Sequence, residues 1–80
     1  MNEDSLDLSG LKCPLPALMA RKALDRLPPG FVLTVTATDP LAPVDIPHMC
    51  GEEGHMVETI TRREGHTCFR IRRGPQRAAK

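Results

Sequence analysis

Two prolines that follow a cysteine, Pro14 and Pro16, constrain the fold of this chain more than any other feature. Proline is tolerated within an α-helix only in the first turn, where its missing N–H costs nothing. Both prolines lead into the amphipathic run of residues 17–27, so they mark the start of a helix. Gly10 lets the backbone turn towards that helix from a preceding strand. Cys13 is therefore predicted to lie at, or next to, the helix N-cap.

A cysteine in this position is expected to be reactive. The unpaired N–H groups and the positive end of the helix dipole point towards its sulfur, and both favour thiolate over thiol. Lys12 adds a cation beside Cys13. Pro16 stands where the second cysteine of a Cys-x-x-Cys pair would be, which argues against a dithiol mechanism. The alternative reading is a small buried side chain that happens to cap a helix.

The first half of the chain predicts a βαβ unit. Apolar and polar residues alternate over residues 6–9 and 31–38, which is typical of strands with one buried face. Between them, residues 14–27 form a helix with alanine and leucine on one side and charged residues on the other. Two strands joined by such a helix are parallel, with a right-handed crossover. Residues 1–5 are polar and are expected to be loose.

The second half predicts a short helix and a hairpin. We expect the helix to begin at Asp45, its N-cap, with Pro47 in its first turn and an early end at the following glycines. Cys50 falls on the apolar face of this helix, so it is expected in the core. Residues 55–63 and 66–73 then pair as a hairpin.

Together these elements predict an α/β (α+β) two-layer sandwich of order βαβαββ, in which two helices cover one face of a four-stranded mixed sheet. We expect one domain over residues 1–80, with an ordered core at about 6–74 and a flexible tail at 75–80. The net charge of +1 predicts no strong attraction to nucleic acid or membrane. Three cysteines and no secretory signal favour a reducing cytoplasm.

Three apolar residues lie outside the apolar stripe of the first helix, in the turns beside Cys13. They are Leu15, Leu18 and Met19. Apolar side chains there can form a docking patch for a partner around the sulfur. The alternatives are a loop that covers them, or scattered exposed residues without a role.

The residues around the cysteine also carry a family signature. The pattern Leu-Asp-x-x-Gly-Leu-x-Cys-Pro-x-Pro runs through residues 6–16, and Asp-Ile-Pro at residues 45–47 and Gly-His at residues 54–55 continue it. In this register the chain resembles the TusA/SirA-type sulfur-carrier proteins over about residues 6–74. The third cysteine, Cys68, and the basic tail depart from the usual pattern of the family.

The resemblance implies that Cys13 accepts a sulfane sulfur as a persulfide, from a cysteine desulfurase or a rhodanese-type donor, and passes it to an acceptor protein. It also implies a small cytoplasmic protein that serves tRNA thiolation, molybdenum-cofactor biosynthesis or sulfur oxidation. Thiol–disulfide exchange chemistry agrees with this role, because a thiolate can attack a donor persulfide and later be displaced by an acceptor thiolate. Whether such a chain is an enzyme or a protein substrate stays open. No cofactor is expected, and nothing demands a dimer.

Other functions compete with this reading. The cysteines and histidines supply ligand types but no Cys-x-x-Cys or His-x-x-x-His pair, so no metal site is expected. Five of the eleven basic residues fall within the last eleven positions, yet no stacking aromatics accompany them, so direct nucleic-acid binding is not expected. The remaining alternative is a non-catalytic regulatory module that binds protein or RNA, in which Cys13 only caps a helix.

Overall fold

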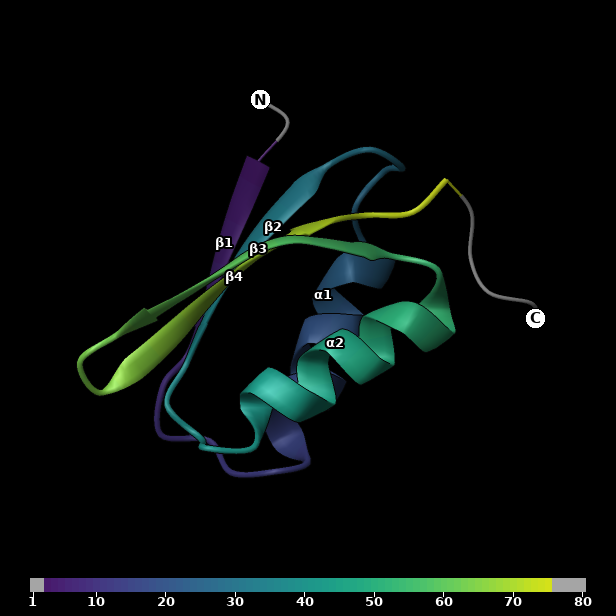
Figure 1. Ribbon diagram of the computed structural model, residues 1–80. Helices are drawn as coiled ribbons and strands as arrows, with labels where there is room; N and C mark the ends of the chain where they lie inside the picture. Colours follow the sequence, from purple (N-terminus) through teal and green to yellow (C-terminus); the bar gives the residue numbers. More distant parts are fainter. Residues whose placement is uncertain (1–2, 76–80) are drawn as a thin grey trace.

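The computed structural model describes residues 3–75, and over these residues the chain forms one layer of four strands and one layer of two helices (Figure 1). The elements, in chain order, are β1 (Glu3–Leu8), α1 (Leu15–Asp25), β2 (Val32–Ala37), α2 (Ala42–Glu53), β3 (Met56–Arg63) and β4 (His66–Arg72). The predicted βαβαββ sandwich is therefore confirmed. All of the predicted flexible tail except Pro75 lies outside the described residues.

The sheet is mixed, as predicted, with strand order β1-β2-β4-β3. β1 and β2 are parallel, while β4 runs antiparallel to both of its neighbours. One row across the sheet joins Leu8 to Ala37, Ala37 to Thr67, and Thr67 to Arg62. The end of the sheet where β1 leads towards Cys13 is therefore also the end that carries the β3–β4 hairpin turn.

The core lies between the inner face of the sheet and the two helices. Its most deeply buried large side chains, each below 2 % exposed, are Phe69, Leu24, Leu33, Ile46, Ile71, Val35, Pro16 and Cys50. Burying a side chain such as Phe69 or Leu24 contributes about 1.5–3 kcal/mol to stability. Cys50 is in the core as predicted, and burial raises the pKa of its thiol to about 11. Among the described residues, no helix is long and apolar enough to cross a membrane.

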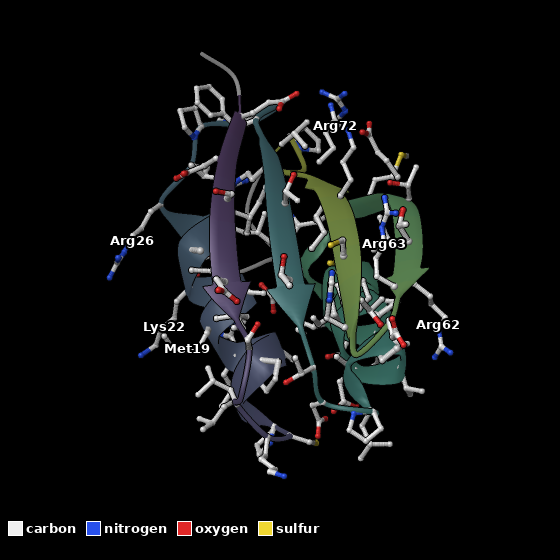
Figure 2. The ribbon with its side chains drawn as sticks, turned by 90° about the vertical axis from the view of Figure 1, so that its left-hand side faces the viewer. Met19, Lys22, Arg26, Arg62, Arg63 and Arg72 are labelled. Carbon is white, nitrogen blue, oxygen red and sulfur yellow. The ribbon has the colours of Figure 1, made fainter. Side chains whose placement is uncertain are left out.

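The prediction of a loose segment over residues 1–5 is wrong for residues 3–5, because β1 begins at Glu3; residues 1–2 lie outside the described residues. Glu3 pairs with Val32 on β2, and its carboxylate accepts a hydrogen bond from Arg70 at 2.9 Å. Figure 2 views the molecule from the sheet side, with the strands in front of the helices. Because no helix of the described chain covers this outer face, the polar residues at the start of β1 can be part of a strand.

The predicted start of the second helix is also wrong. α2 begins at Ala42 with Leu41 as N-cap, so Asp45 lies in the first turn and is not the cap. Pro43 occupies the second helical position, where proline is tolerated, and Pro47 lies inside the helix. The buried face of α2 compensates for the hydrogen bond that Pro47 removes. The helix also continues past Gly51, the first of the two glycines that were predicted to end it.

The end of α2 shows which glycine stops a helix here. The helix passes through Gly51 and ends at Gly54, whose φ of 82° is left-handed. Glycine adopts this conformation at little cost, so Gly54 is the effective stop.

The predicted basic stripe on the last strand is largely neutralised within the molecule. Arg70 and Arg72 both donate to Glu58, at 3.3 and 2.6 Å. Arg73 is not on the surface: it is 5 % exposed and donates to the backbone oxygen of Leu24 at 3.1 Å. The described part of this stripe therefore offers little uncompensated charge to a partner.

Candidate functional site

Cys13 lies in the loop between β1 and α1, directly before the N-cap Pro14, and it is exposed. Gly10 has a φ of 86° and donates its N–H to the hydroxyl oxygen of Thr38 at 2.8 Å, which ties the loop to the end of β2. Pro16 is buried in the second helical position. The loop thus holds the cysteine at the start of α1, as the two prolines predicted.

The immediate partner of the sulfur comes from the other helix. Cys13 Sγ donates a hydrogen bond to Asp45 Oδ2 at 2.8 Å. A carboxylate stabilises the protonated thiol and opposes a thiolate, because two negative charges would then lie side by side. The pKa of Cys13 is accordingly raised, first by this hydrogen bond, then by partial burial, and then by the charges of Asp45 and Asp39.

The expectation of an activated thiolate in the free chain is therefore wrong. The helix end acts on the sulfur only through partial charges, whereas Asp45 presents a full charge in direct contact. The N–H of Leu15 is already engaged by the backbone oxygen of Lys12 at 2.8 Å. The Lys12 side chain makes no hydrogen bond to Cys13 among the described residues.

A groove of about 280 Å³ runs between α1 and α2 and opens beside the sulfur. Its lining includes Cys13, Pro14, Ala17, Leu18, Asp45 and Met49. Further along, Arg21 pairs with Glu53 at 3.7 Å, and His48 with Glu52 at 3.3 Å. The groove therefore combines apolar side chains with the Asp45 carboxylate beside the sulfur, and carries polar and charged side chains farther along.

Exposed apolar side chains lie in the first turns of α1 and at the start of α2. On α1, the predicted patch is exposed, at 46 % for Leu15, 45 % for Leu18 and 39 % for Met19. On α2, Leu41 and Val44 are 51 % and 64 % exposed and precede Asp45 in the chain. The sequence analysis missed the second pair because it began this helix at Asp45. We call these five residues the apolar rim.

Comparison with known proteins identifies the family. The family model described as Sulfurtransferase TusA matches residues 4–73. The chain belongs to the TusA family. A Neisseria meningitidis serogroup B protein, provisionally named a sulfur carrier, is 48 % identical to this TusA-family chain over 65 residues, which are 81 % of this chain and 88 % of that protein.

Two further relatives agree with this assignment. The sulfur carrier protein TusA of Pseudomonas syringae pv. syringae is 40 % identical over 68 residues, covering 85 % of this chain and 81 % of that protein. The crystal structure of a SirA-like protein from Desulfitobacterium hafniense matches with a TM-score of 0.76 and 28 % sequence identity, over 88 % of this chain and 96 % of that one.

The other cysteines of this TusA-family chain lie in different surroundings. Cys50 is in the core, and Cys68 is half-buried on β4, where its sulfur lies 3.7 Å from the hydroxyl oxygen of Thr36. Residues 3–75 contain no group of three or more histidine, cysteine or acidic side chains able to hold a metal ion. Cys13 is thus the exposed thiol of the chain.

Proposed function

We propose that this chain carries a sulfane sulfur on Cys13, as a persulfide, from a donor protein to an acceptor protein. One observation carries the proposal: the exposed sulfur of a TusA-family fold lines a groove between two helices, and exposed apolar side chains lie at the start of both helices. The buried Cys50 and the half-buried Cys68 lack these surroundings. We further propose that the chain acts as a single domain in a reducing cytoplasm.

The chemistry is an exchange between sulfur atoms. The thiolate of Cys13 attacks the terminal sulfur of the donor persulfide; a new S–S bond forms, and the donor leaves as a thiolate. An acceptor thiolate then attacks the terminal sulfur on Cys13, which leaves as a thiolate in turn. Each step breaks one S–S bond and forms one, so no external oxidant or reductant is consumed.

Asp45 controls the proton of this reaction. In the free chain it holds Cys13 as a thiol, which is a weak nucleophile. Attack therefore requires that the proton move to Asp45, or that a partner bring a cation to Asp45 and weaken its hold on the proton. We propose that docking of the donor supplies this change. Lys12 lies next to the cysteine in the chain and adds positive charge to the site.

The partner is proposed to dock on the apolar rim. The rim combines α1 side chains such as Leu18 with α2 side chains such as Val44, so one protein surface can cover both helices and enclose the sulfur. Enclosure excludes water and stray thiols from the persulfide while it is exchanged. The donor class we propose is a cysteine desulfurase or a rhodanese-type protein, with an acceptor in tRNA thiolation, molybdenum-cofactor biosynthesis or sulfur metabolism.

Intact-protein mass measurement tests the proposal. The chain is incubated with a cysteine desulfurase and cysteine, and the donor is then removed. A mass gain of one sulfur atom is expected for the original chain and for Cys68→Ser, but not for Cys13→Ser. A gain that persists in Cys13→Ser, or no gain with either donor class, would overturn the carrier role and favour a regulatory interaction module.

A further inference from the structure

We propose that Thr38 is a positioning residue for Cys13: its hydroxyl ties the loop that carries the sulfur to the turn that leads into α2, and so holds the sulfur against Asp45. Three observations carry this role. The sulfur and the carboxylate come from separate segments, one lateral hydrogen bond links these segments, and short turns connect that bond to both groups. The part of Thr38 in sulfur transfer rests on the proposed function, whereas its effect on the thiol can be measured without it.

The contact between Cys13 and Asp45 joins two segments that are distant in the chain. Cys13 lies in the loop of residues 9–14, and Asp45 lies in the first turn of α2, directly after the turn of residues 38–41. The sulfur and the carboxylate oxygen are 2.8 Å apart. Because a hydrogen bond weakens as its geometry departs from the optimum, a small shift of either segment would weaken this contact.

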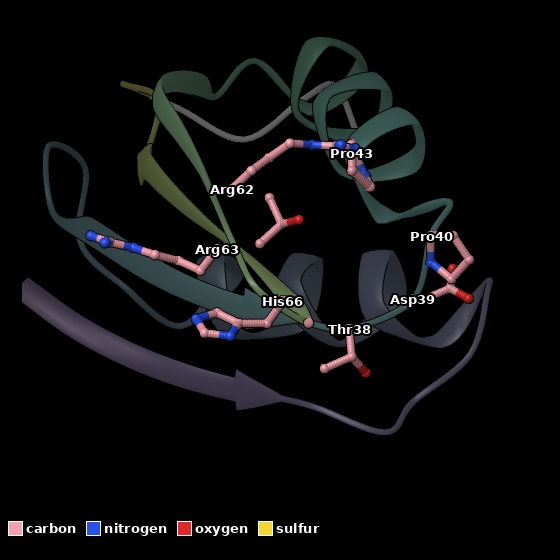
Figure 3. Close-up of a pocket in the computed structure, with 9 residues that line it drawn as sticks. Thr38, Asp39, Pro40, Pro43, Arg62, Arg63 and His66 are labelled. Atoms are coloured by element: carbon pink, nitrogen blue, oxygen red, sulfur yellow. The ribbon is translucent and has the colours of Figure 1, made fainter.

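Thr38 provides the second link between the same two segments. Its hydroxyl oxygen accepts the N–H of Gly10 at 2.8 Å. Beyond the β1–β2 ladder, this bond and the Cys13–Asp45 bond are the hydrogen bonds that join residues 9–14 to residues 38–45 within the described chain. The Thr38 side chain points towards the loop that follows β1 (Figure 3).

On the sulfur side, the link lies close to Cys13. Gly10 is three positions before Cys13 in the chain. The N–H of Leu11 donates to the backbone oxygen of Leu8 at 3.2 Å, and Leu11 packs against the core. The loop is therefore fixed at its first residues, and a shift of Gly10 would displace the sulfur.

On the carboxylate side, a run of hydrogen bonds leads from the residue after Thr38 to Asp45. Asp39 accepts the N–H of Ala42 on its backbone oxygen at 3.1 Å, and the N–H of Leu41 on its carboxylate at 3.2 Å. The N–H of Asp45 then donates to the backbone oxygen of Leu41 at 2.9 Å. These bonds make the turn and the first turn of α2 one unit, so the position of Thr38 determines that of Asp45.

The hydroxyl of Thr38 can be removed without disturbing the core. The side chain is exposed, whereas the preceding Ala37 is buried. Branching at Cβ restricts χ1, which keeps the hydroxyl directed at its partner. Valine retains this branched shape without the hydroxyl, and serine retains the hydroxyl without the methyl group. The two substitutions therefore separate the hydrogen bond from the packing of the side chain.

The carboxylates beside the sulfur determine the direction of the expected effect. Asp45 and Asp39 both raise the pKa of Cys13, and the hydrogen bond to Asp45 makes the largest contribution. A looser contact therefore favours the thiolate and speeds its alkylation near neutral pH. Removing the hydroxyl of Thr38 leaves the other charged or titratable side chains of the loop and groove unchanged; these are Lys12, Arg21, His48, Glu52 and Glu53.

The test is the pH dependence of Cys13 alkylation by iodoacetamide, in a Cys68→Ser background. Thr38→Val should move the midpoint of the rate profile to lower pH and raise the rate at pH 7 by about two- to fivefold, as expected for the loss of one hydrogen bond. Thr38→Ser should retain the original midpoint. Thr34→Val is the matched control, because Thr34 also lies on β2 but is paired with Ser5, away from the loop.

A double variant shows whether Thr38 acts through the carboxylate. In an Asp45→Asn background, Thr38→Val should barely move the midpoint, because the contact has already lost its charge. An unchanged midpoint in Thr38→Val would overturn the role of Thr38, as would an equal shift in Thr34→Val or in the Asp45→Asn background. A higher rate at every pH with the same midpoint would also overturn it, since it would indicate greater exposure of the sulfur and not a weaker contact.

Sulfur loading of the original chain, measured by mass, keeps this outcome separate from that of the carrier role. Failure of that chain to gain sulfur would refute the carrier role, while the alkylation profiles would still decide whether Thr38 positions the thiol. A gain of sulfur together with an unchanged midpoint in Thr38→Val would support the carrier role and refute the positioning role.

Discussion

The proton on Cys13 is held by a carboxylate that comes from a different helix. The hydrogen bond to Asp45 spans 32 positions of the chain and makes the thiol harder to ionise. An asparagine at this position would keep the size of the side chain but remove the negative charge. The thiolate would then no longer face a like charge.

We therefore expect Asp45→Asn to increase the alkylation rate of Cys13 near neutral pH by about threefold or more. Iodoacetamide kinetics over a range of pH, in a Cys68→Ser background, would measure the rate at Cys13. Asp39→Asn is the comparison. Asp39 raises the pKa of Cys13 only through its charge and contributes least to that rise, so this variant should change the alkylation rate less. An unchanged or slower rate in Asp45→Asn would contradict the role assigned to the hydrogen bond.

The position of Cys13 was predictable from its neighbours, but its protonation state was not. Pro14 and Pro16 restrict the local backbone, so the start of α1 follows from residues adjacent in the chain. The contact with Asp45 depends on how the two helices pack, which local patterns do not encode.

At the scale of elements, the start of α2 brings Asp45 to the sulfur and carries two of the five residues of the apolar rim, Leu41 and Val44. On the proposed function, Val44→Glu should slow sulfur transfer from the donor by about fivefold or more, because a charge would be buried in the docked interface. Met56→Glu is a matched control, since Met56 is 62 % exposed against 64 % for Val44 and lies at the opposite end of β3 from the hairpin turn. Equal transfer rates for the two variants would show that the rim is not a docking surface.

Elements with strong periodic patterns were predicted well, and element starts were predicted poorly. β2 and the second arm of the hairpin, β4, alternate clearly, and α1 has a continuous apolar stripe. α2 begins three residues before Asp45 because Asp39 engages the N–H of Leu41 and Pro43 is acceptable in the first turn. Packing of the apolar face of α2 then outweighs the backbone hydrogen bond that Pro47 removes. Whether packing or local preference prevails at such a position depends on the folded chain.

At the scale of the whole molecule, the end opposite the sulfur is closed by a buried polar cluster. His55 is 8 % exposed, and its Nδ1 accepts the N–H of Gly74 at 2.9 Å. Its Nε2 is buried and has no hydrogen-bond partner among residues 3–75. Burial and the neighbouring charge of Arg73 lower the pKa of His55 from its usual value of 6.5. A proton on Nδ1 would also remove the acceptor that holds Gly74.

This cluster predicts a loss of stability in mild acid. The pKa of His55 is lower in the folded chain than in the unfolded chain. Its contribution to the free energy of unfolding is therefore fully present above pH 6.5 and is lost as the pH falls through the pKa of the folded state. Chemical denaturation should show a decrease on the order of 1 kcal/mol between pH 7 and pH 5. In His55→Asn the chain should be less stable at pH 7 but lose less on acidification. An equal decrease in both proteins would show that the loss of stability in acid comes from groups other than His55.

On the proposed function, the unloaded Cys13 has to stay unmodified until it meets a sulfur donor. Small oxidants and alkylating metabolites that collide with Cys13 find a protonated sulfur, since they carry nothing that draws Asp45 away. A protein surface with a cation in the right place does. If the carrier proposal holds, the 2.8 Å hydrogen bond between Cys13 in the β1–α1 loop and Asp45 on α2 favours a partner that brings a cation to Asp45 over chance encounters with small molecules.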